Sequence, residues 1–443
     1  MNQDRRRHWG MLGAAALLAA ACTGAAGTPT VGPTGTSSTA PTASAPPATA
    51  TPGATATVTA TATATAPGPT DAPTATPTGA PPSGMPTSVG EGEGALNVLA
   101  WPGYAEDGSF QPEYDWVHPF ETATGCDVSA TFFGTSDEAF RLFAAGGFDV
   151  VSASGDAAFR LADGGFVSPV NTDLVPNYID VIDVLKDKPW NTFDGVHYGI
   201  PHGRGANLLM WNTEEVSPAP TSWMSVYDPD SPYATKITAY DAPIYIADAA
   251  VVLMTTHPEL GITDPYSLDE TQFAAAVDLT RQQRPLISEY WSDYLKQMDA
   301  FRNGVSVLGT TWQVIPNLLQ IEEPPVPVDV VKPVEGATGW SDTWMVSSTT
   351  EHVNCAYKWL DWIVSPQTNA DVAYFYGESP ANSKSCDLIP DATHCEIFHA
   401  DADDGFWDDV YYWNTPRADC LDGRGPICVD YNRWIDAWID IKG

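Results

Sequence analysis

The segment ALNVLAW, residues 95–101, predicts a buried β-strand and begins a regular alternation of strands and helices. The next four segments continue that alternation as helix, strand, helix and strand: QPEYDWVHPFETATG (111–125), CDVSATFF (126–133), SDEAFRLFAAGG (136–147) and FDVVSAS (148–154). Strands that alternate with helices indicate an α/β domain built on a parallel sheet.

Polar and aromatic residues follow two of these strands at the point where each strand ends. Trp101 to Tyr104 come after the first strand, and Ser154 to Asp156 come after the third. Because ligands of open α/β sheets bind beyond the carboxyl ends of the strands, this edge is the predicted site.

A second α/β segment lies further along the chain. KITAYDAPIYIADAAVVLMTT (236–256) predicts a strand ending near Tyr240 and Asp241, followed by a helix. NGVSVLGTTWQVI (303–315) predicts a strand ending at Trp312, and CAYKWLDWIVSPQTNADVAYFYG (355–377) predicts one helix.

The first 94 residues have the composition of an export signal and a linker. Arg5, Arg6 and Arg7 precede a short apolar run, which ends in LAAAC at Cys22. This pattern predicts a signal peptide over 1–21 and a lipid anchor on Cys22 at the extracellular face of the bacterial membrane. Residues 22–94 consist mostly of Thr, Ala, Pro, Gly and Ser, so we expect a disordered stalk.

The remaining segment, 95–443, is long enough for one large domain or two lobes. The chain has 56 acidic and 20 basic residues, a formal net charge of −36. Nucleic-acid partners require basic surfaces, so this balance argues against them and favours a cationic ligand.

Seven cysteines are present, and lipidation of Cys22 would leave six in an oxidising compartment. Short spacing favours the pairs Cys386–Cys395 and Cys420–Cys428, which leaves Cys126 with Cys355, although fifteen pairings are possible. The absence of a C-x-x-C motif argues against a redox or zinc role.

Sequence motifs of catalysis and cofactor binding are missing. The chain has no H-E-x-x-H, G-x-S-x-G or phosphate-loop motif. The segment DADDGFWDD (401–409) has the composition of a calcium loop, but its glycine is misplaced and the closing glutamate is missing. We therefore expect no catalytic residue, no cofactor and no metal, and we interpret His202 as structural.

Six segments in order resemble the polyamine-binding (spermidine/putrescine) proteins of bacterial ABC importers. They are LNVLAWPGY, FDVVSASGD, YGIPHGRGANLLMWN, LGTTW, VKPVEGATGWSDTWMVS and YGESPANSKS. The resemblance implies a two-lobed periplasmic-binding-protein fold of type II with two crossover connections, no enzymatic activity, and a membrane permease as partner. It places lobe 1 at about 95–203 and 343–383, and lobe 2 at about 204–342 and 384–443. We expect a monomer.

The resemblance also implies which residues line the cleft. Trp101, Tyr104, Trp312 and Trp340 match the family's aromatic clamp, Ser154 its serine, and Asp241 and Asp342 two of its amine-binding carboxylates. At four positions the chain departs from family members: Asp156 for tyrosine, Ile244 for glutamate, Glu378 for tyrosine and Asp408 for glutamine. Because the departures redistribute acidic groups, Asp156, Glu378 and Asp408 join the predicted site.

The fragment GWSDTW, residues 339–344, fits this interpretation chemically. A carboxylate beside indole rings offers an organic cation both an ion pair and an aromatic face. Asp342 would pair an ammonium and Trp340 would pack on methylenes, while Trp344 is expected in the core.

Arg204, at the first crossover, leaves two interpretations open. It could pair with an acid as a structural clamp, or bind the carboxylate of an ω-amino acid such as 4-aminobutyrate. Two further alternatives are a carbohydrate-active secreted protein, whose cleft would also combine carboxylates with tryptophans, and an adhesion lipoprotein. The leading hypothesis is a receptor that delivers a putrescine- or spermidine-like solute to a permease.

Overall fold

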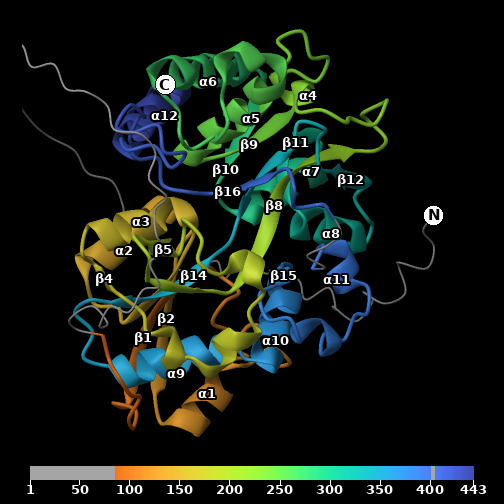
Figure 1. Ribbon diagram of the computed structural model, residues 1–443. Coiled ribbons are helices and arrows are strands. Elements are labelled where there is room, and N and C mark those ends of the chain that lie inside the picture. The colour runs from red at the N-terminus through yellow and green to blue at the C-terminus, as the bar shows by residue number, and fades with distance from the viewer. Residues whose placement is uncertain (1–84, 401–404) are drawn as a thin grey trace, which may run out of the picture. The chain divides into compact units, whose positions relative to one another are not determined.

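The computed structural model describes residues 85–400 and 405–443, which fold around two large β-sheets (Figure 1). The predicted signal peptide, Cys22 and the predicted stalk as far as residue 84 lie outside the described residues. Within the end of the predicted stalk, the Glu93 carboxylate accepts hydrogen bonds from the backbone N–H groups of Asn354 and Cys355. These contacts fix residues near 93 against the start of a helix.

The first sheet contains the strands predicted at residues 95–154. Its strand order is β2-β1-β3-β14-β4, with β7 beside β14, and β1 runs parallel to both β2 and β3. The bounds are β1 Ala95–Ala100, β2 Asp127–Phe132, β3 Val150–Ala153, β4 Val167–Ser168, β7 Gly199–Pro201 and β14 Thr343–Ser347.

The second sheet contains the strands predicted to end at Tyr240 and Trp312. Its strand order is β10-β9-β11-β8-β13-β16, and β12 and β15 also pair with β8. The bounds are β8 Gly203–Asn212, β9 Ile237–Tyr240, β10 Ile287–Trp291, β11 Leu308–Trp312, β12 Val328–Val331, β13 Ala337–Trp340, β15 Ser379–Pro380 and β16 Val410–Tyr412. A separate hairpin joins β5 Thr192–Phe193 to β6 Val196–His197.

The chain crosses between the sheets from β7 to β8 and returns from β13 to β14. These crossings make both sheets mixed, because β14 is antiparallel to β3 and β8 is antiparallel to β11. The predicted parallel alignment of the three strands within residues 95–154 is confirmed, and the antiparallel neighbour β14 comes from the returning chain. The apolar pattern of a strand indicates whether the strand is buried. It does not indicate whether the strand runs parallel or antiparallel to its neighbour.

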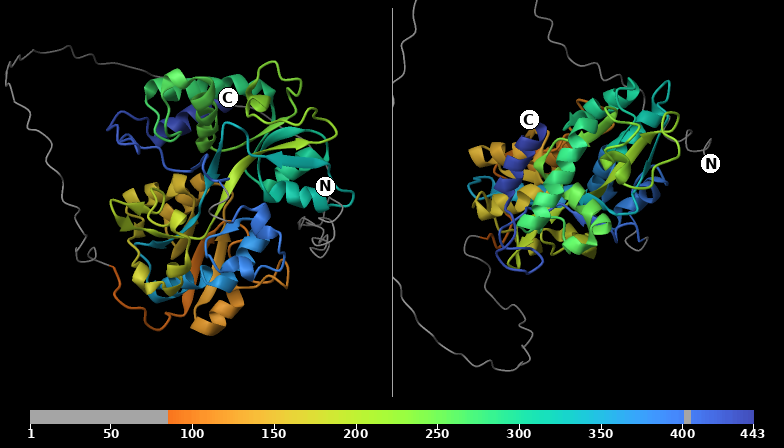
Figure 2. Two further views of the ribbon diagram at one scale, coloured as in Figure 1. Left: turned by 45° about the vertical axis from the view of Figure 1, so that its right-hand side comes forward. Right: turned by 90° about the horizontal axis from the view of Figure 1, so that it is seen from above.

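Helices pack on both sheets, and several have clear start and stop signals. Asp269 forms a capping box with Gln272, and Asp430 caps the last helix. The last helix contacts α6 beside the second sheet (Figure 2). The bounds are α1 Val117–Thr124, α2 Ser136–Ala145, α3 Gly155–Asp163, α4 Met224–Tyr227, α5 Ile246–Thr256, α6 Glu270–Gln283, α7 Tyr294–Arg302, α8 Val314–Ile321, α9 Val353–Ile363, α10 Pro366–Tyr376, α11 His394–Ile397 and α12 Tyr431–Lys442.

Two helix predictions need correction. The helix predicted over 111–125 begins only at Val117, and the single helix predicted over 355–377 is two helices, α9 and α10. Pro366 separates them because proline has no N–H to donate and disfavours a helical residue before it. After α10 the chain pairs with β8 through Ser379 and Pro380, directly beyond Gly377 and Glu378.

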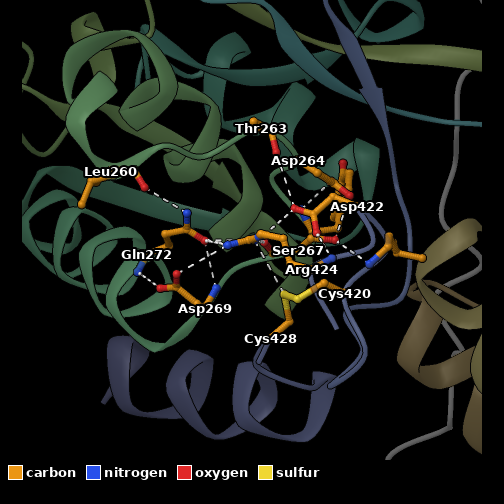
Figure 3. Close-up of polar contacts among 12 residues, drawn as sticks. Leu260, Thr263, Asp264, Ser267, Asp269, Gln272, Cys420, Asp422, Arg424 and Cys428 are labelled. Carbon is orange, nitrogen blue, oxygen red and sulfur yellow. Dashed lines mark hydrogen bonds and ion pairs between the residues drawn. A yellow bond between two sulfur atoms is a disulfide. The ribbon is translucent and has the colours of Figure 1, made fainter. Parts of the chain in front are cut away.

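Three disulfides join the cysteines as short spacing suggested: Cys126–Cys355, Cys386–Cys395 and Cys420–Cys428. The Cys420–Cys428 disulfide closes a loop that contains Arg424. The Arg424 guanidinium donates hydrogen bonds to Asp269, Gln272 and Asp422 (Figure 3). Across residues 85–400 and 405–443, no helix is both long and apolar enough to cross a membrane.

Candidate functional site

Two carboxylates that share one phenol hydroxyl form the centre of the candidate site. The Tyr104 hydroxyl lies 2.9 Å from Asp342 Oδ2 and 2.8 Å from Glu378 Oε2, and all three side chains are buried. A phenol has one proton, so it donates to one carboxylate at a time, and the other contact requires a proton on the second carboxyl. Neither carboxylate has a Lys or Arg ion-pair partner within the described residues.

Segments that lie far apart in the sequence bring these groups together. Tyr104 lies in the turn after β1, Asp342 lies between β13 and β14, and Glu378 lies between α10 and β15. Gly203, at the start of β8, makes room for them. A Cβ atom on Gly203 would lie 2.4 Å from the Glu378 carboxyl carbon, so a side chain at this position would force the Glu378 carboxylate or the backbone to shift.

Ser154 completes the hydrogen bonding of Asp342. Its hydroxyl, at the N-cap of α3, donates to Asp342 Oδ1 at 2.5 Å. Burial raises the pKa of the Asp342 carboxyl to about 6, and the charge of Glu378 adds to this, while the bonds from Ser154 and Tyr104 act in the opposite direction. The ionised carboxylate is poorly solvated here, so a bound cation would stabilise it.

His202 lies beside the acid pair, which its structural interpretation did not foresee. Its ring is 4.4 Å from the Tyr104 ring, and Nδ1 is 3.2 Å from Glu378 Oε1 without the alignment of a hydrogen bond. Its backbone N–H donates to the Asp342 carbonyl at 2.9 Å. The backbone of His202, between β7 and β8, is therefore hydrogen-bonded to the returning connection between β13 and β14. Its ring lies beside Glu378.

One aromatic wall borders the acid pair. Tyr376 packs against Tyr104 with ring centroids 4.4 Å apart and against Trp340 at 5.8 Å. Trp340 lies over Gly205, where a Cβ atom would come within 2.3 Å of the indole. Trp344 is fully buried and packs on Trp359, which confirms its expected place in the core.

A second aromatic group surrounds Tyr240. Its ring packs against Trp312 at 5.7 Å, Trp291 at 5.2 Å and Trp413 at 5.6 Å. Burial raises the pKa of the Tyr240 hydroxyl, and four nearby carboxylates add to the shift, among them the predicted site residues Asp156, Asp342 and Asp241. Tyr240 thus lies within electrostatic range of three acids that the sequence assigned to the site.

Asp156 is buried in the first turn of α3, and its Oδ1 atom has no hydrogen-bond partner in the described structure. Burial raises the pKa of its carboxyl to about 7, with a further contribution from the charge of Asp137. Trp101 is also buried, but its ring packs on Phe133 at 4.6 Å, within the core of the first sheet. Asp156 thus retains a buried oxygen without a hydrogen-bond partner, whereas the Trp101 ring is packed in the core.

Two predicted carboxylates stand apart from the acid pair. Asp241 accepts a hydrogen bond from Trp438 Nε1 at 3.2 Å and forms an ion pair with Lys442 Nζ at 2.5 Å. Asp408 is solvent-exposed in the turn before β16. The structure does not bring either carboxylate into contact with Asp342 or Glu378.

Arg204 points to the other side of β8 from Gly203. Its guanidinium packs over the Trp407 ring at 4.0 Å and donates to Tyr412, Ser379 and the His399 carbonyl, each at 3.4 Å. Across residues 85–400 and 405–443 it has no carboxylate partner, so no acid clamp is present there. It lines a cavity of about 20 Å³, room for one water, together with Trp312, Trp340 and Tyr376.

The described residues contain no group of His, Cys, Asp and Glu that could hold a metal ion. Ser154 contacts the Asp342 carboxylate, and the described residues place no histidine in hydrogen-bond contact with its hydroxyl. Buried carboxylates, hydroxyls and aromatic faces are the groups that recognise an organic ammonium.

Comparison with known proteins identifies the family. Residues 115–396 match the family of bacterial extracellular solute-binding proteins, more than half of the chain. The chain belongs to this family. Its members bind solutes for transport and are not enzymes, and the resemblance noted in the sequence is confirmed.

The relatives are distant. The spermidine/putrescine-binding periplasmic protein of Escherichia coli (strain K12) is 21% identical over 323 residues, covering 70% of this chain and 88% of the relative. A putative spermidine/putrescine ABC transporter structure from Listeria monocytogenes has a TM-score of 0.63 at 18% identity, covering 79% and 99% of the two chains. The Atu4243-GABA receptor has a TM-score of 0.56 at 19% identity, covering 79% and 95%. These likenesses confirm the two-lobed fold.

Proposed function

We propose that this protein is the receptor of an ABC importer for a polyamine-like solute, and that Asp342 and Glu378 bind one of its ammonium groups. The observation that supports this is the buried acid pair, which no Lys or Arg of the described part of the chain neutralises. Burying a carboxylate is costly unless a positive charge or a proton accompanies it. An ammonium entering the site replaces the proton that the pair otherwise shares with Tyr104.

The aromatic walls suit the rest of such a ligand. Trp340 and Tyr376 border the acid pair, and Tyr240 and Trp312 form a second surface. Each fully buried methylene of an alkyl chain contributes about 0.8 kcal/mol. Asp156, which has an unpartnered buried oxygen, is our candidate for a second ammonium.

A thermal-shift screen of diamines, polyamines, ω-amino acids and sugars tests the proposal. Ligand at a hundred times its Kd adds about 2.7 kcal/mol to the free energy of unfolding. Stabilisation by putrescine or spermidine that is lost in Asp342→Asn supports it. Stabilisation by sugars alone would favour the carbohydrate-binding alternative, and no stabilisation by any solute would favour an adhesin.

The membrane anchor is a separate part of the proposal. We infer that Cys22 carries lipid and holds the receptor near its permease at the extracellular face of the membrane. Cys22→Ser should release the protein into the soluble fraction or leave an unprocessed precursor. A mature species that still requires detergent for extraction would contradict lipidation at Cys22.

A second candidate ligand is an ω-amino acid, which Arg204 favours. This arginine is buried beside the cavity and meets no carboxylate in the described residues, and its three hydrogen bonds are all long. A ligand carboxylate could accept two parallel hydrogen bonds from this guanidinium. Loss of 4-aminobutyrate binding in Arg204→Gln with diamine binding retained would establish this candidate over the polyamine.

A further inference from the structure

Asp241 has the environment of an ammonium site that is already filled. Its Oδ1 atom accepts from Lys442 Nζ at 2.5 Å and from Trp438 Nε1 at 3.2 Å. The Lys442 ammonium also lies 5.8 Å from the centre of the Trp438 ring. A primary amine on an alkyl chain, bound to a carboxylate beside an indole, is the same chemistry as the proposed ligand at Asp342 and Trp340.

The position of Asp241 connects it to the second aromatic surface. It directly follows Tyr240, and its backbone N–H donates to the Trp291 carbonyl at 2.7 Å. Trp291 and Tyr240 both pack against Trp312. Asp241 therefore lies at the end of the strand that carries Tyr240, beside the second aromatic surface to which the proposed function assigns the alkyl chain of the ligand.

We propose that Lys442 is a specificity-determining residue, which occupies Asp241 and thereby withholds this carboxylate from the ligand. The inference rests on the proposed amine-binding function and deepens it. With Asp241 filled, a longer polyamine gains no ion pair there for its extra ammonium, so the receptor favours a short diamine. Removing the Lys442 charge frees Asp241 for the additional ammonium.

A purely structural role for the ion pair is the competing explanation. The attachment of α12 depends mainly on other contacts: Tyr431, Trp434, Trp438 and Ile441 are buried, and Asp430 caps the helix. The side chains of Asp241 and Lys442 are 27% and 36% exposed, and ion pairs of this kind contribute little to stability. Variants at Lys442 should therefore fold, which permits a binding test.

Titration calorimetry with putrescine and spermidine on the wild-type protein, Lys442→Gln and Lys296→Gln provides that test. Lys296 is a matched control, because it pairs with Glu289 and bonds the Tyr290 carbonyl, and Tyr290 packs on Trp438. We expect Lys442→Gln to bind spermidine about three- to tenfold more tightly, with putrescine affinity nearly unchanged. Lys296→Gln should change neither affinity by as much.

The double variant Asp241→Asn with Lys442→Gln identifies the route of the gain. If Asp241 receives the extra ammonium, the double variant loses the improved spermidine affinity. If the wild-type protein binds putrescine but Lys442→Gln has unchanged spermidine affinity, this inference is overturned and the proposed function stands. An equal gain in Lys296→Gln also overturns it, because the effect would then follow net charge. Absence of amine binding in every variant overturns the proposed function and this inference together.

Discussion

Asp342 and Asp241 were both expected to bind an ammonium, and the structure places them in different states. Asp342 is buried, bonded only to hydroxyl groups through its carboxylate, and has a raised pKa. Asp241 is partly exposed and paired with Lys442. The difference shows that a carboxylate of the right type and position is not by itself a ligand site. What distinguishes Asp342 is that no Lys or Arg among residues 85–400 and 405–443 forms an ion pair with it.

The largest predicted difference is in diamine affinity when each of the two carboxylates is neutralised. Asp342→Asn keeps the shape of the site but removes its charge, so we expect diamine binding to weaken by about 2–5 kcal/mol. Asp241→Asn should weaken it far less, because Lys442 already holds that carboxylate. Calorimetric titration of both variants checks this, and equal losses would mean that the two acids act alike.

A methyl group at Gly203 tests whether the acid pair depends on close approach of β8. Gly203→Ala places a Cβ atom 2.4 Å from the Glu378 carboxyl carbon. We expect a loss of about 1–3 kcal/mol in the free energy of unfolding, together with weaker amine binding. Gly134→Ala is the control, because this glycine has no positive φ and its added Cβ atom would make only ordinary van der Waals contacts, at 3.6 Å and 3.9 Å. Chemical denaturation measures both, and a Gly203→Ala protein as stable as the wild type would contradict the packing described.

The raised pKa values predict an unusual pH dependence for the ligand-free protein. Asp342 and Asp156 have folded-state pKa values of about 6 and about 7, above their usual 3.8. Between pH 4 and 7 the folded state therefore binds more protons than the unfolded state, so their contribution to stability falls as the pH rises. We expect the Tm of the ligand-free protein to fall by a few degrees between pH 5 and 8.

Asp342→Asn measures how much the Asp342 carboxyl contributes to the fall in Tm. The asparagine side chain does not titrate, so the variant should lose less stability between pH 5 and 8. Saturating diamine should also flatten the fall, because the ligand charge replaces the proton. Thermal denaturation at several pH values measures this. A wild-type profile that Asp342→Asn leaves unchanged would show that Asp342 does not titrate as described.

The smallest predicted effect is the change in the free energy of unfolding when the partly exposed ion pair between Lys442 and Asp241 is broken. Lys442→Gln removes the partner of Asp241, and we expect less than about 1 kcal/mol of lost stability, because the pair is partly solvated. Denaturant unfolding beside the wild type checks it. A loss of several kcal/mol would mean that the pair is structural and that the two carboxylates differ less than we describe.

Much of this arrangement could be predicted from the sequence, because the signals were local. Strand ends at Ala100, Ala153, Tyr240 and Trp312 followed from apolar runs, and they carry Tyr104, Ser154 and Asp241 close behind. The fragment around Asp342 indicated a cation partner by its composition. These inferences needed no knowledge of contacts over long distances.

The rest depended on contacts between distant segments. Tyr104 meets residues 238 and 274 positions away, and Lys442 meets Asp241 across 201 positions. No local pattern marks such pairs. Tyr376 and His202 were missed for the same reason, since an aromatic residue before a helix-ending glycine and a lone histidine are usually structural. The direction of Arg204 could have been inferred, because side chains alternate along a strand and Gly203 faces the acid pair.

Proton release on ligand binding tests the central claim most directly. Calorimetric titration with butane-1,4-diamine at pH 6, in two buffers of different ionisation enthalpy, reports how many protons leave the protein. If an ammonium replaces the proton held by the pair of Asp342 and Glu378, the wild-type enthalpies differ between buffers with the sign of proton release. That difference should shrink in Asp342→Asn, and the part that Asp156 contributes should remain. Tight diamine binding with the same enthalpy in both buffers, or with unchanged proton release in Asp342→Asn, would contradict the assignment of this acid pair as the ammonium site.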